Sequence, residues 1–426
     1  MALLEHKARN LDEAIKNLEP VHSLEIDELE DYYVEREHSP IKRIAKMLNV
    51  AYPQKFLLTG HRGNGKSTEL AKLEAHLQDQ FFIVRYPLRD TLNLFDLQYL
   101  DVLISIVVQL AERVEKAALP LAKETLTRLE TLWSFGQDID IEYEDSSTIG
   151  REANLGVGGI LRVLMHLGVR IRNEHSTREA VRARVQHRIS DLLEGLDTLS
   201  RDIETQTQKR VLCIVEDLDK TDLSKAKDIF YSHGESISAP ELAIIYTFPV
   251  ALSRSNEFNH IANYFSATYT LPNFKVEHKN AQIDEIGRAA LKMILLNRLE
   301  PSLLADDALD LLINYSGGVP RELIRLTRDA CVEAAISESE SAQVTHVKTV
   351  ISEEIKRFKR MLSEEQLSLL RAIKRDRDID QTEAYQNLLH TLSLLEYEND
   401  ELWYDVNPLV ADLLRDQNAY TNRDRP

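Results

Sequence analysis

Hydrophobic and polar positions near the N-terminal end of the chain follow the order of an α/β core. The apolar run 55–60 is typical of a buried strand and ends in a glycine-rich turn, and residues 67–78 then repeat with helical period. A second apolar run covers 81–86. Strand, loop, helix and strand in this order predict the start of a parallel sheet covered by helices.

The next strand-like run, at 211–215, follows only after a long helical segment, so we predict a helical insertion at about 91–209. Within it, apolar residues recur every three or four positions from Val181 to Ile203. This spacing predicts a single amphipathic helix of about 25 residues. A polar stretch at 144–159 that contains Gly and Ser divides the insertion into two parts.

Two further strand-like runs, at 242–247 and 267–272, complete the core, and the chain then reads as helix from Asn280 to Leu362. The last segment predicts three helices followed by a β-hairpin that turns at residues 399–400, which is the pattern of a winged helix. The expected domains are an N-terminal helical linker (1–50), an α/β core that contains the insertion (51–279), a helical lid (280–362) and a winged helix (363–426).

Composition and charge narrow the class of protein. The chain has a net charge of −18 and only two cysteines, Cys213 and Cys331, which lie in apolar runs without metal-ligand spacing. Such cysteines indicate a reducing, cytoplasmic setting. An acidic surface repels nucleic acid and anionic lipid unless basic residues cluster locally. The two most apolar windows, 97–110 and 155–171, contain charged residues, so we expect buried helices and no contact with a membrane.

The glycine-rich turn after the first strand carries the strongest chemical signal. Residues 60–67, GHRGNGKS, fit the pattern G-x-x-x-x-G-K-[ST] of a P-loop, in which glycines let backbone N–H groups surround phosphate oxygens. Lys66 would reach the β- and γ-phosphates, and Ser67 would hold Mg²⁺ at the start of a helix whose dipole favours anions. We therefore expect ATP and Mg²⁺ as cofactors. The expected nucleotide-binding residues are Gly60, His61, Arg62, Gly63, Asn64, Gly65, Lys66, Ser67 and Thr68.

A second acidic element ends the strand at 211–215. Glu216 and Asp217 follow this strand directly, and Asp219 lies two residues further on, where a P-loop enzyme holds magnesium and orients the attacking water. We assign Glu216 to the metal and Asp217 to the water. An Asp followed by a Glu is the usual order in this Walker B element, and the reversed order here predicts slow hydrolysis.

A third motif, SGGVPREL at 316–323, resembles the lid motif of AAA+ and STAND ATPases. The resemblance implies that Arg321 reaches the γ-phosphate as the residue called sensor 2, and that Pro320 contacts the nucleotide. It also implies a sensor-1 role for Thr247, at the end of the strand after Walker B. A helix start with proline in its first turn explains the motif without a ligand.

The same resemblance extends over nearly the whole chain. It places Arg254 near the position of an arginine finger that serves a neighbouring subunit. Tyr33 and Val34 lie where linkers of these ATPases pack on adenine, and ordinary core contacts explain them equally well. The order of linker, P-loop core, lid and winged helix is similar to that of origin-recognition initiators, transposition helper ATPases and STAND regulators. GHRGNGKSTEL together with LEYENDELWYDVNP is similar to a group of bacterial ATPases.

Two functional hypotheses stay open. The first is a nucleotide-controlled switch that binds or assembles partner proteins, with a homo-oligomer as one form of assembly. The second is a DNA-associated AAA+ ATPase that uses the winged helix or the basic insertion. A small-molecule kinase is a weaker third, because a sensor-2 lid and a winged helix are rare in kinases of this fold.

Charge distribution separates the first two hypotheses. Between Ser363 and Asp416 there are thirteen acidic and five basic residues, and the expected recognition helix at 383–395 has neither Lys nor Arg. Such a helix lacks the contacts that dominate DNA binding, so we favour a partner protein over nucleic acid. From Arg162 to Arg188 there are seven arginines and two glutamates. This cluster either holds nucleic acid or an acidic partner, or it forms a solvated face whose arginines pair with nearby acids.

Overall fold

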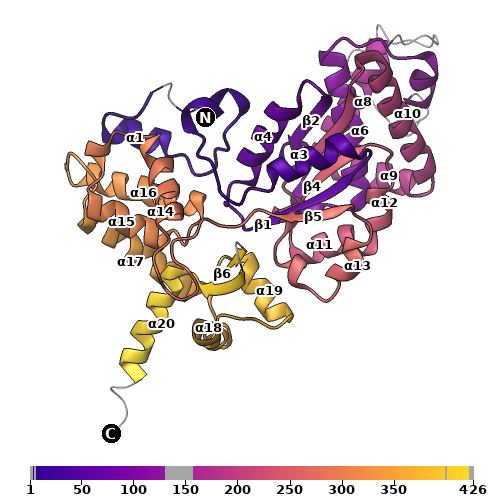
Figure 1. Ribbon diagram of the computed structural model, residues 1–426. Helices are drawn as coiled ribbons and strands as arrows, with labels where there is room; N and C mark the ends of the chain where they lie inside the picture. Colours follow the sequence, from indigo (N-terminus) through magenta and orange to yellow (C-terminus); the bar gives the residue numbers. More distant parts are fainter. Residues whose placement is uncertain (1–2, 4–5, 130–156, 399–400, 422–426) are drawn as a thin grey trace.

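The computed structural model describes residues 3, 6–129, 157–398 and 401–421. The chain forms two lobes (Figure 1). One lobe, coloured indigo to pink, holds the sheet and the helical insertion. The other, coloured orange and yellow, holds the lid helices, a small hairpin and the C-terminal helix.

A five-stranded parallel sheet in the order β2-β3-β4-β1-β5 forms the centre of the first lobe. β1 lies between β4 and β5, with Leu58 opposite Thr247, and β3 lies on the other side of β4. The carboxyl ends of β1, β4 and β3 therefore meet at one edge, where ligands bind in such sheets. The strands are β1 (Lys55–Gly60), β2 (Phe81–Pro87), β3 (Arg210–Glu216), β4 (Ala243–Pro249) and β5 (Ala267–Thr270).

Successive side chains of a strand face different helical layers. Phe56 and Leu58 of β1 pack with α3 (Ile41–Val50) and α4 (Lys66–Leu77), whereas Leu57 packs on the opposite face. That face is covered by the insertion and by short helices before β4 and β5, and burial on both faces explains the unbroken apolar runs in the sequence. The short helices are α11 (Leu223–Lys227), the π-helical turn η4 (Asp228–Ser232), α12 (Gly234–Ser238) and α13 (Phe258–Ala262).

The insertion between β2 and β3 is helical, as predicted. The predicted single helix from Val181 to Ile203 is wrong, because Arg188 has non-helical backbone angles (φ −139°, ψ 36°) and interrupts the helix there. The apolar stripe continues across the break, since both helices bury it in one core. The polar stretch 144–159 lies outside the described residues as far as position 156. The insertion contains α5 (Leu88–Thr91), η2 (Leu94–Asp96), α6 (Tyr99–Lys116), α8 (Val157–Asn173), α9 (His175–Gln186) and α10 (Ile189–Thr207).

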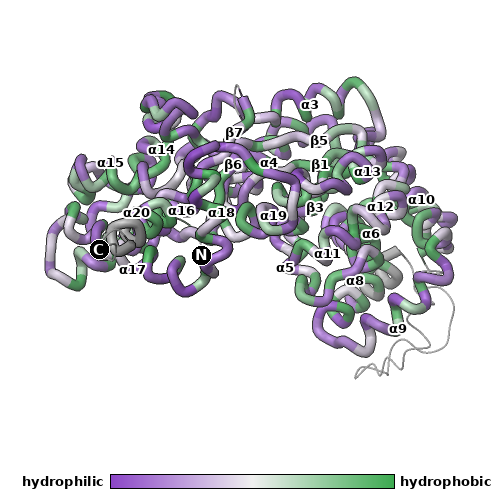
Figure 2. Tube along the Cα trace, turned by 90° about the horizontal axis from the view of Figure 1, so that it is seen from below, coloured by the Kyte–Doolittle hydropathy of each residue, from purple (hydrophilic) through white to green (hydrophobic). Residues whose placement is uncertain are grey.

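The two apolar windows of the sequence fall mainly in α6 and α8, which pack against each other. None of the helices in the described ranges has the length and apolarity that a membrane crossing needs. Figure 2 shows hydrophobic positions (green) recurring along the helices of both lobes with hydrophilic positions (purple) between them, as expected for amphipathic helices.

The lid and the C-terminal segment share one hydrophobic core. The predicted three helices before the hairpin are wrong, because in this segment only α18 (Glu364–Asp376) and α19 (Glu383–His390) precede it and α20 (Pro408–Thr421) follows it. α18 ends at Arg377, which takes a left-handed conformation (φ 53°). The lid contains α14 (Glu285–Leu296), η6 (Pro301–Leu303), α15 (Asp306–Tyr315), α16 (Pro320–Ile336) and α17 (Val344–Met361). The C-terminal domain (363–421) contains α18 (Glu364–Asp376), α19 (Glu383–His390), β6 (Leu394–Glu398), β7 (Leu402–Val406) and α20 (Pro408–Thr421).

The N-terminal segment divides between the two lobes. α1 (Leu11–Asn17) packs on α16 in the lid core, whereas α3 packs on the sheet. The connection between them contains η1 (Ile26–Glu28) and α2 (Leu29–Tyr32) and borders a cavity at the carboxyl edge of the sheet.

Candidate functional site

The glycine-rich loop joins β1 to α4 and takes backbone conformations that other residues avoid. Gly63 and Gly65 have φ angles of 82° and 97°, and a Cβ at Gly63 would lie 2.7 Å from the Cβ of Arg321. The first-turn residues of α4 line the adjacent cavity, and N–H groups at this position have no intrahelical acceptor. A curled loop that leads into a helix N-terminus is suited to bind phosphate.

Lys66 is buried against the loop that it follows. Its ammonium donates to the carbonyl oxygens of Gly60 and His61, each at 2.8 Å, and pairs with Asp219 at 2.9 Å. Burial lowers the pKa of Lys66, against the opposing effect of Asp219. Burial disfavours the ionised form of Asp219, but the charges of Lys66 and Lys220 outweigh it and lower the pKa of this carboxyl. The loop therefore holds a buried pair of ions.

Glu216 ends β3, is buried, and is held by two neighbours. Arg85 of β2 donates to its Oε1 at 3.0 Å, and the hydroxyl of Ser67 lies near the same carboxylate. Arg85 also pairs with Glu74 and Glu25. Burial raises the pKa of Glu216, and Arg85 and Ser67 oppose this shift. The two predicted magnesium ligands thus lie together and offer the oxygen atoms that Mg²⁺ prefers.

Asp217 has a left-handed backbone (φ 75°) and precedes the turn η3 (Leu218–Lys220). Its carboxylate pairs with Lys220 and lies 3.4 Å from Nε of Arg89. Asp219 lies beside Thr247, whose buried hydroxyl forms no hydrogen bond of good geometry in the described part of the chain. Two carboxylates are thus placed to orient water, and the assignment of this role to Asp217 stays a prediction with Asp219 as its rival.

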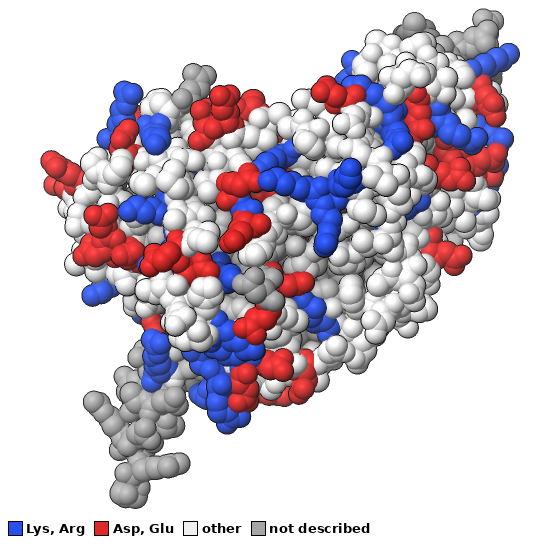
Figure 3. Space-filling view, in the orientation of Figure 1, with Lys and Arg blue, Asp and Glu red and all other residues white. Residues whose placement is uncertain are grey.

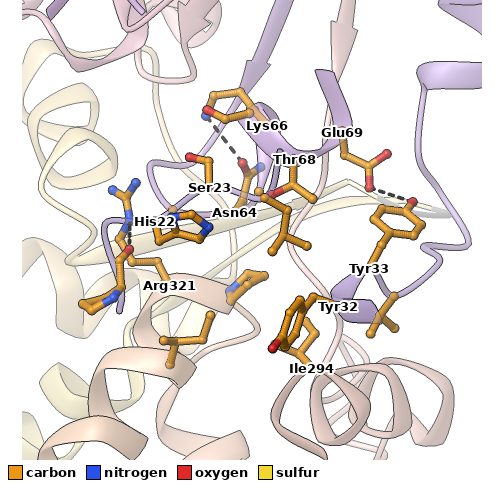
Figure 4. Close-up of a pocket in the computed structure, with 18 of the residues that line it drawn as sticks. His22, Ser23, Tyr32, Tyr33, Asn64, Lys66, Thr68, Glu69, Ile294 and Arg321 are labelled. Atoms are coloured by element: carbon orange, nitrogen blue, oxygen red, sulfur yellow. Dashed lines mark hydrogen bonds between the residues drawn. The ribbon is translucent and has the colours of Figure 1, made fainter. Parts of the chain in front are cut away.

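The lid contacts the phosphate loop directly. The backbone N–H of Arg321 donates to the Gly63 carbonyl at 3.1 Å, and its guanidinium donates to the Pro20 carbonyl at 3.2 Å. Pro320 occupies the first position of α16, where a missing N–H costs no helical hydrogen bond. Figure 4 shows Arg321 on the side of the cavity opposite Tyr33.

These groups line one cavity between the sheet edge, the N-terminal segment and the lid. The predicted site residues on its wall are Tyr33, Val34, Gly63, Asn64, Gly65, Lys66, Ser67, Thr68, Glu216, Asp217, Thr247, Pro320 and Arg321. The predicted residues that do not line it are Gly60, His61, Arg62 and Arg254. Figure 4 shows Tyr32 and Ile294 at the end opposite Lys66, and this end has an apolar wall that suits a base.

The donor set fits a nucleoside triphosphate with a divalent metal. The loop and the start of α4 supply N–H donors and the ammonium of Lys66 for phosphates, and Ser67 and Glu216 supply oxygen ligands for the metal. Thr247 Oγ1, buried at the cavity, forms no hydrogen bond of good geometry with the described residues, and Asp217 Oδ2 has only its ion-pair contact with Arg89. A ligand or its water would satisfy both oxygens. When bound, Mg²⁺ would neutralise phosphate charge and order its oxygens.

Another face of the phosphate loop contacts the C-terminal domain. The backbone N–H of Glu396, in β6, donates to Nε2 of His61 at 2.7 Å. Arg62 donates to the carbonyl of Lys220 at 2.8 Å, and its Nη2 lies 2.8 Å from Nε2 of His390, in α19. Burial lowers the pKa of His61 to about 3 and that of His390 to about 4. Both imidazoles are therefore neutral near pH 7, and each presents Nε2 to a donor.

Arg254 ends the turn η5 (Leu252–Arg254) and binds the C-terminal domain of its own chain. Its Nε and Nη2 donate to the two carboxylate oxygens of Glu396 at 2.5 and 2.8 Å, and Nη2 lies 3.3 Å from Glu398. Burial raises the pKa of Glu396, against the opposing effect of Arg254. The predicted finger role of Arg254 toward a neighbouring subunit therefore requires that β6 first releases it.

The arginine-rich part of the insertion is largely neutralised in the structure. Arg178 and Arg182 are buried and pair with Asp96 at 3.1 and 3.2 Å, and Arg182 also pairs with Asp101. Figure 3 shows acidic and basic side chains intermixed over the upper right of the molecule, where the insertion lies. Of the two readings of this cluster, the structure favours the one in which arginines pair with nearby acids.

Four residues of the site had no sequence signal. Arg36 donates to the carbonyls of Asn64 and Pro272 at 2.6 and 2.8 Å, and thereby supports the loop. Arg36 comes from the N-terminal segment, Arg85 from β2, Arg298 from the lid and Glu396 from β6. No spacing along the sequence links these positions to the loop. These four residues are Arg36, Arg85, Arg298 and Glu396.

No protein-family model and no curated protein matches the chain. Solved structures that are similar to it include Drosophila ORC bound to DNA (12% identity, covering 97% of this chain and 94% of that one, TM-score 0.43). A second is the Walker-type ATPase of Pyrococcus abyssi (14% identity, covering 94% of this chain and 99% of that one, TM-score 0.46). A third is the ORC2 protein of Aeropyrum pernix in ADPNP–ADP complexes (11% identity, covering 95% of this chain and 98% of that one, TM-score 0.45). The strand order and the loop geometry decide the fold. The chain has the α/β fold of a P-loop NTPase.

Proposed function

We propose that this chain is an ATP-binding, slowly hydrolysing switch of the AAA+ or STAND type, in which the bound nucleotide controls the docking of the C-terminal domain on the core. One observation carries the proposal: a single loop supplies both the phosphate site and the contact with the C-terminal domain. A loop that closes around a triphosphate must move His61 and Arg62 with it, because they share its backbone. The docking contact then differs in free energy between nucleotide states, which is what a switch requires.

Each group of the cavity has a role in this proposal. Lys66 binds the terminal phosphates, and Arg321 approaches them from the lid. Ser67 and Glu216 hold the magnesium ion. Asp217 or Asp219 orients the attacking water, and the many cations around both acids fit slow turnover, because a carboxylate held in ion pairs is a weak base.

We propose a protein as the partner that the released domain binds. Support comes from the C-terminal domain, whose sequence has more acidic than basic residues, and from the arginines of the insertion, which pair with acids. A DNA-associated role would need a surface with cations that are free to replace counterions. The geometry of the nucleotide cavity favours neither a protein partner nor DNA.

Hydrogen exchange of residues 383–398 tests the proposal. These residues should be protected without nucleotide and with ADP, and should exchange faster with a non-hydrolysable ATP analogue. Lys66→Ala should abolish the difference. Equal protection in all nucleotide states of the wild-type protein, at saturating ligand, would reject the switch while leaving ATP binding in place.

A further inference from the structure

Among the described residues, four arginines are buried, and their surroundings differ. Arg178 and Arg182, in the insertion, pair with carboxylates. Arg36 and Arg298 form no ion pair with a carboxylate in the described part of the chain, and both line the nucleotide cavity. Burying a cation without a counter-charge is unfavourable, so the two cavity arginines must find other partners.

Arg36 finds its partners in the protein. Its two terminal nitrogens donate to the carbonyls of Asn64 and Pro272, and its guanidinium lies 4.1 Å from the ring centroid of Phe274. These contacts use both ends of the guanidinium fork. Arg36 therefore supports the loop and has little capacity left for a ligand.

Arg298 has fewer protein partners. Its Nη1 donates to the Ile294 carbonyl at 2.8 Å, and its guanidinium lies 5.3 Å from the ring centroid of Tyr32. A guanidinium has five N–H donors, so most of those of Arg298 have no acceptor among the described residues. The side chain is only 6% exposed, and burial lowers its pKa to about 10. A cation of this kind on a cavity wall is completed by acceptor atoms of a ligand.

The position of Arg298 identifies which part of a nucleotide it would meet. Its two contacts, Ile294 and Tyr32, lie at the end of the cavity opposite Lys66 (Figure 4). The phosphates belong at the Lys66 end, beside the loop. The acceptors that reach Arg298 therefore come from the base.

We propose that Arg298 reads the base of the nucleotide by donating to acceptor atoms on a purine edge, an inference that rests on the proposed nucleotide site. Both adenine and guanine present N7 as an acceptor. Guanine and hypoxanthine add O6, which a guanidinium can contact together with N7, whereas adenine places an amino donor there. The pocket thus prefers purines to pyrimidines and accepts GTP and ITP at least as well as ATP.

Calorimetric titration of the full chain with Mg²⁺ and ATP, GTP, ITP, CTP or 7-deaza-GTP tests this inference. Arg298→Met should weaken binding of GTP and ITP by about tenfold, which is the lower end of the range expected for loss of a bidentate contact to a base. It should leave CTP binding nearly unchanged. Arg298→Lys keeps the charge but not the fork, so it should fall between wild type and Arg298→Met. In the wild-type protein, 7-deaza-GTP should bind more weakly than GTP. Arg288→Met is the matched control, because Arg288 lies in α14, the helix that Arg298 follows, but pairs with Asp310 outside the cavity.

The outcomes separate this inference from the proposed function. An equal loss for all nucleotides in Arg298→Met, or rejection of ITP and GTP by the wild-type protein, would overturn base reading while leaving the nucleotide switch standing. Failure of the wild-type protein to bind any triphosphate would overturn both.

Discussion

The phosphate loop has two faces, and they differ in what their polar groups contact. On the cavity face, Lys66 and Asp219 form a buried ion pair, and the hydroxyl of Thr247 has no partner of good geometry among the described residues. On the face toward the C-terminal domain, Nε2 of His61 and the guanidinium of Arg62 both have partners, and both histidines of that contact are neutral.

This difference indicates that the phosphate loop has two functions, ligand binding on one face and domain docking on the other. The cavity face keeps charges and unsatisfied oxygens that a charged ligand completes, as binding sites do. The other face is a buried domain contact in which Nε2 of His61 and the guanidinium of Arg62 are hydrogen-bonded, while Nδ1 of His61 has no partner among the described residues. Because the faces share their peptide units, a ligand that reshapes one must affect the other. Four predictions test this comparison, beginning with the largest expected effect.

Lys66→Ala should weaken ATP binding at least about a hundredfold, because charge-assisted hydrogen bonds to two phosphates contribute about 3 kcal/mol or more. Calorimetry measures the affinity. The variant also leaves Asp219 buried without its nearest cation, so its thermal unfolding must be recorded. Lys66→Ala combined with Asp219→Asn removes that unpaired charge and serves as the control. Retained affinity in a folded variant would refute the phosphate site.

The two rival carboxylates should differ in their effect on turnover. Asp217→Asn should lower kcat about tenfold or more with little change in ATP affinity, because a water-orienting group acts in the transition state, whereas Asp219→Asn should retain more turnover. Steady-state kinetics on both variants decides the matter. Full turnover in Asp217→Asn together with loss in Asp219→Asn would show that the assignment from sequence named the wrong acid.

Some parts of the site follow from local sequence motifs, and other parts depend on tertiary packing. Local motifs fix the loop, Glu216 and the lid residue Arg321, because a phosphate cradle needs glycines and a lysine at set spacing. The break at Arg188 escaped prediction, since the apolar stripe continues through it. Partnerships such as Arg254 with Glu396 join segments far apart in the chain, and only the packed tertiary structure brings them together.

Arg254→Ala should loosen the docked C-terminal domain by about 2–3 kcal/mol, somewhat less than for a fully buried pair, because Glu396 would remain buried without its cation. Hydrogen exchange of residues 383–398 without nucleotide should rise accordingly. Glu398→Gln is the matched control, since it removes only the longer 3.3 Å contact and should have a smaller effect.

The same variant separates two roles of Arg254. A latch within the chain predicts faster exchange with turnover preserved in a monomer. A finger for a neighbouring subunit predicts normal ATP binding, poor hydrolysis, and a mass that rises with the ATP analogue in light scattering. Unchanged exchange in Arg254→Ala would contradict the latch.

The smallest expected effect is a dependence of docking on pH. The pKa values of His61 and His390 in the folded protein, about 3 and about 4, lie below the ordinary value of 6.5. The undocked form therefore binds more protons below pH 6.5, so the contribution of these contacts is complete above pH 6.5. It is lost as the pH falls toward 4 for His390 and toward 3 for His61. For each histidine the change is at most about 1.4 kcal/mol per pH unit. His390→Gln keeps a neutral side chain and should flatten the pH profile of exchange at residues 383–398, whereas His187→Gln, at an exposed position in the insertion, should leave it unchanged. Identical profiles in the two variants would show that protonation of His390 does not control docking.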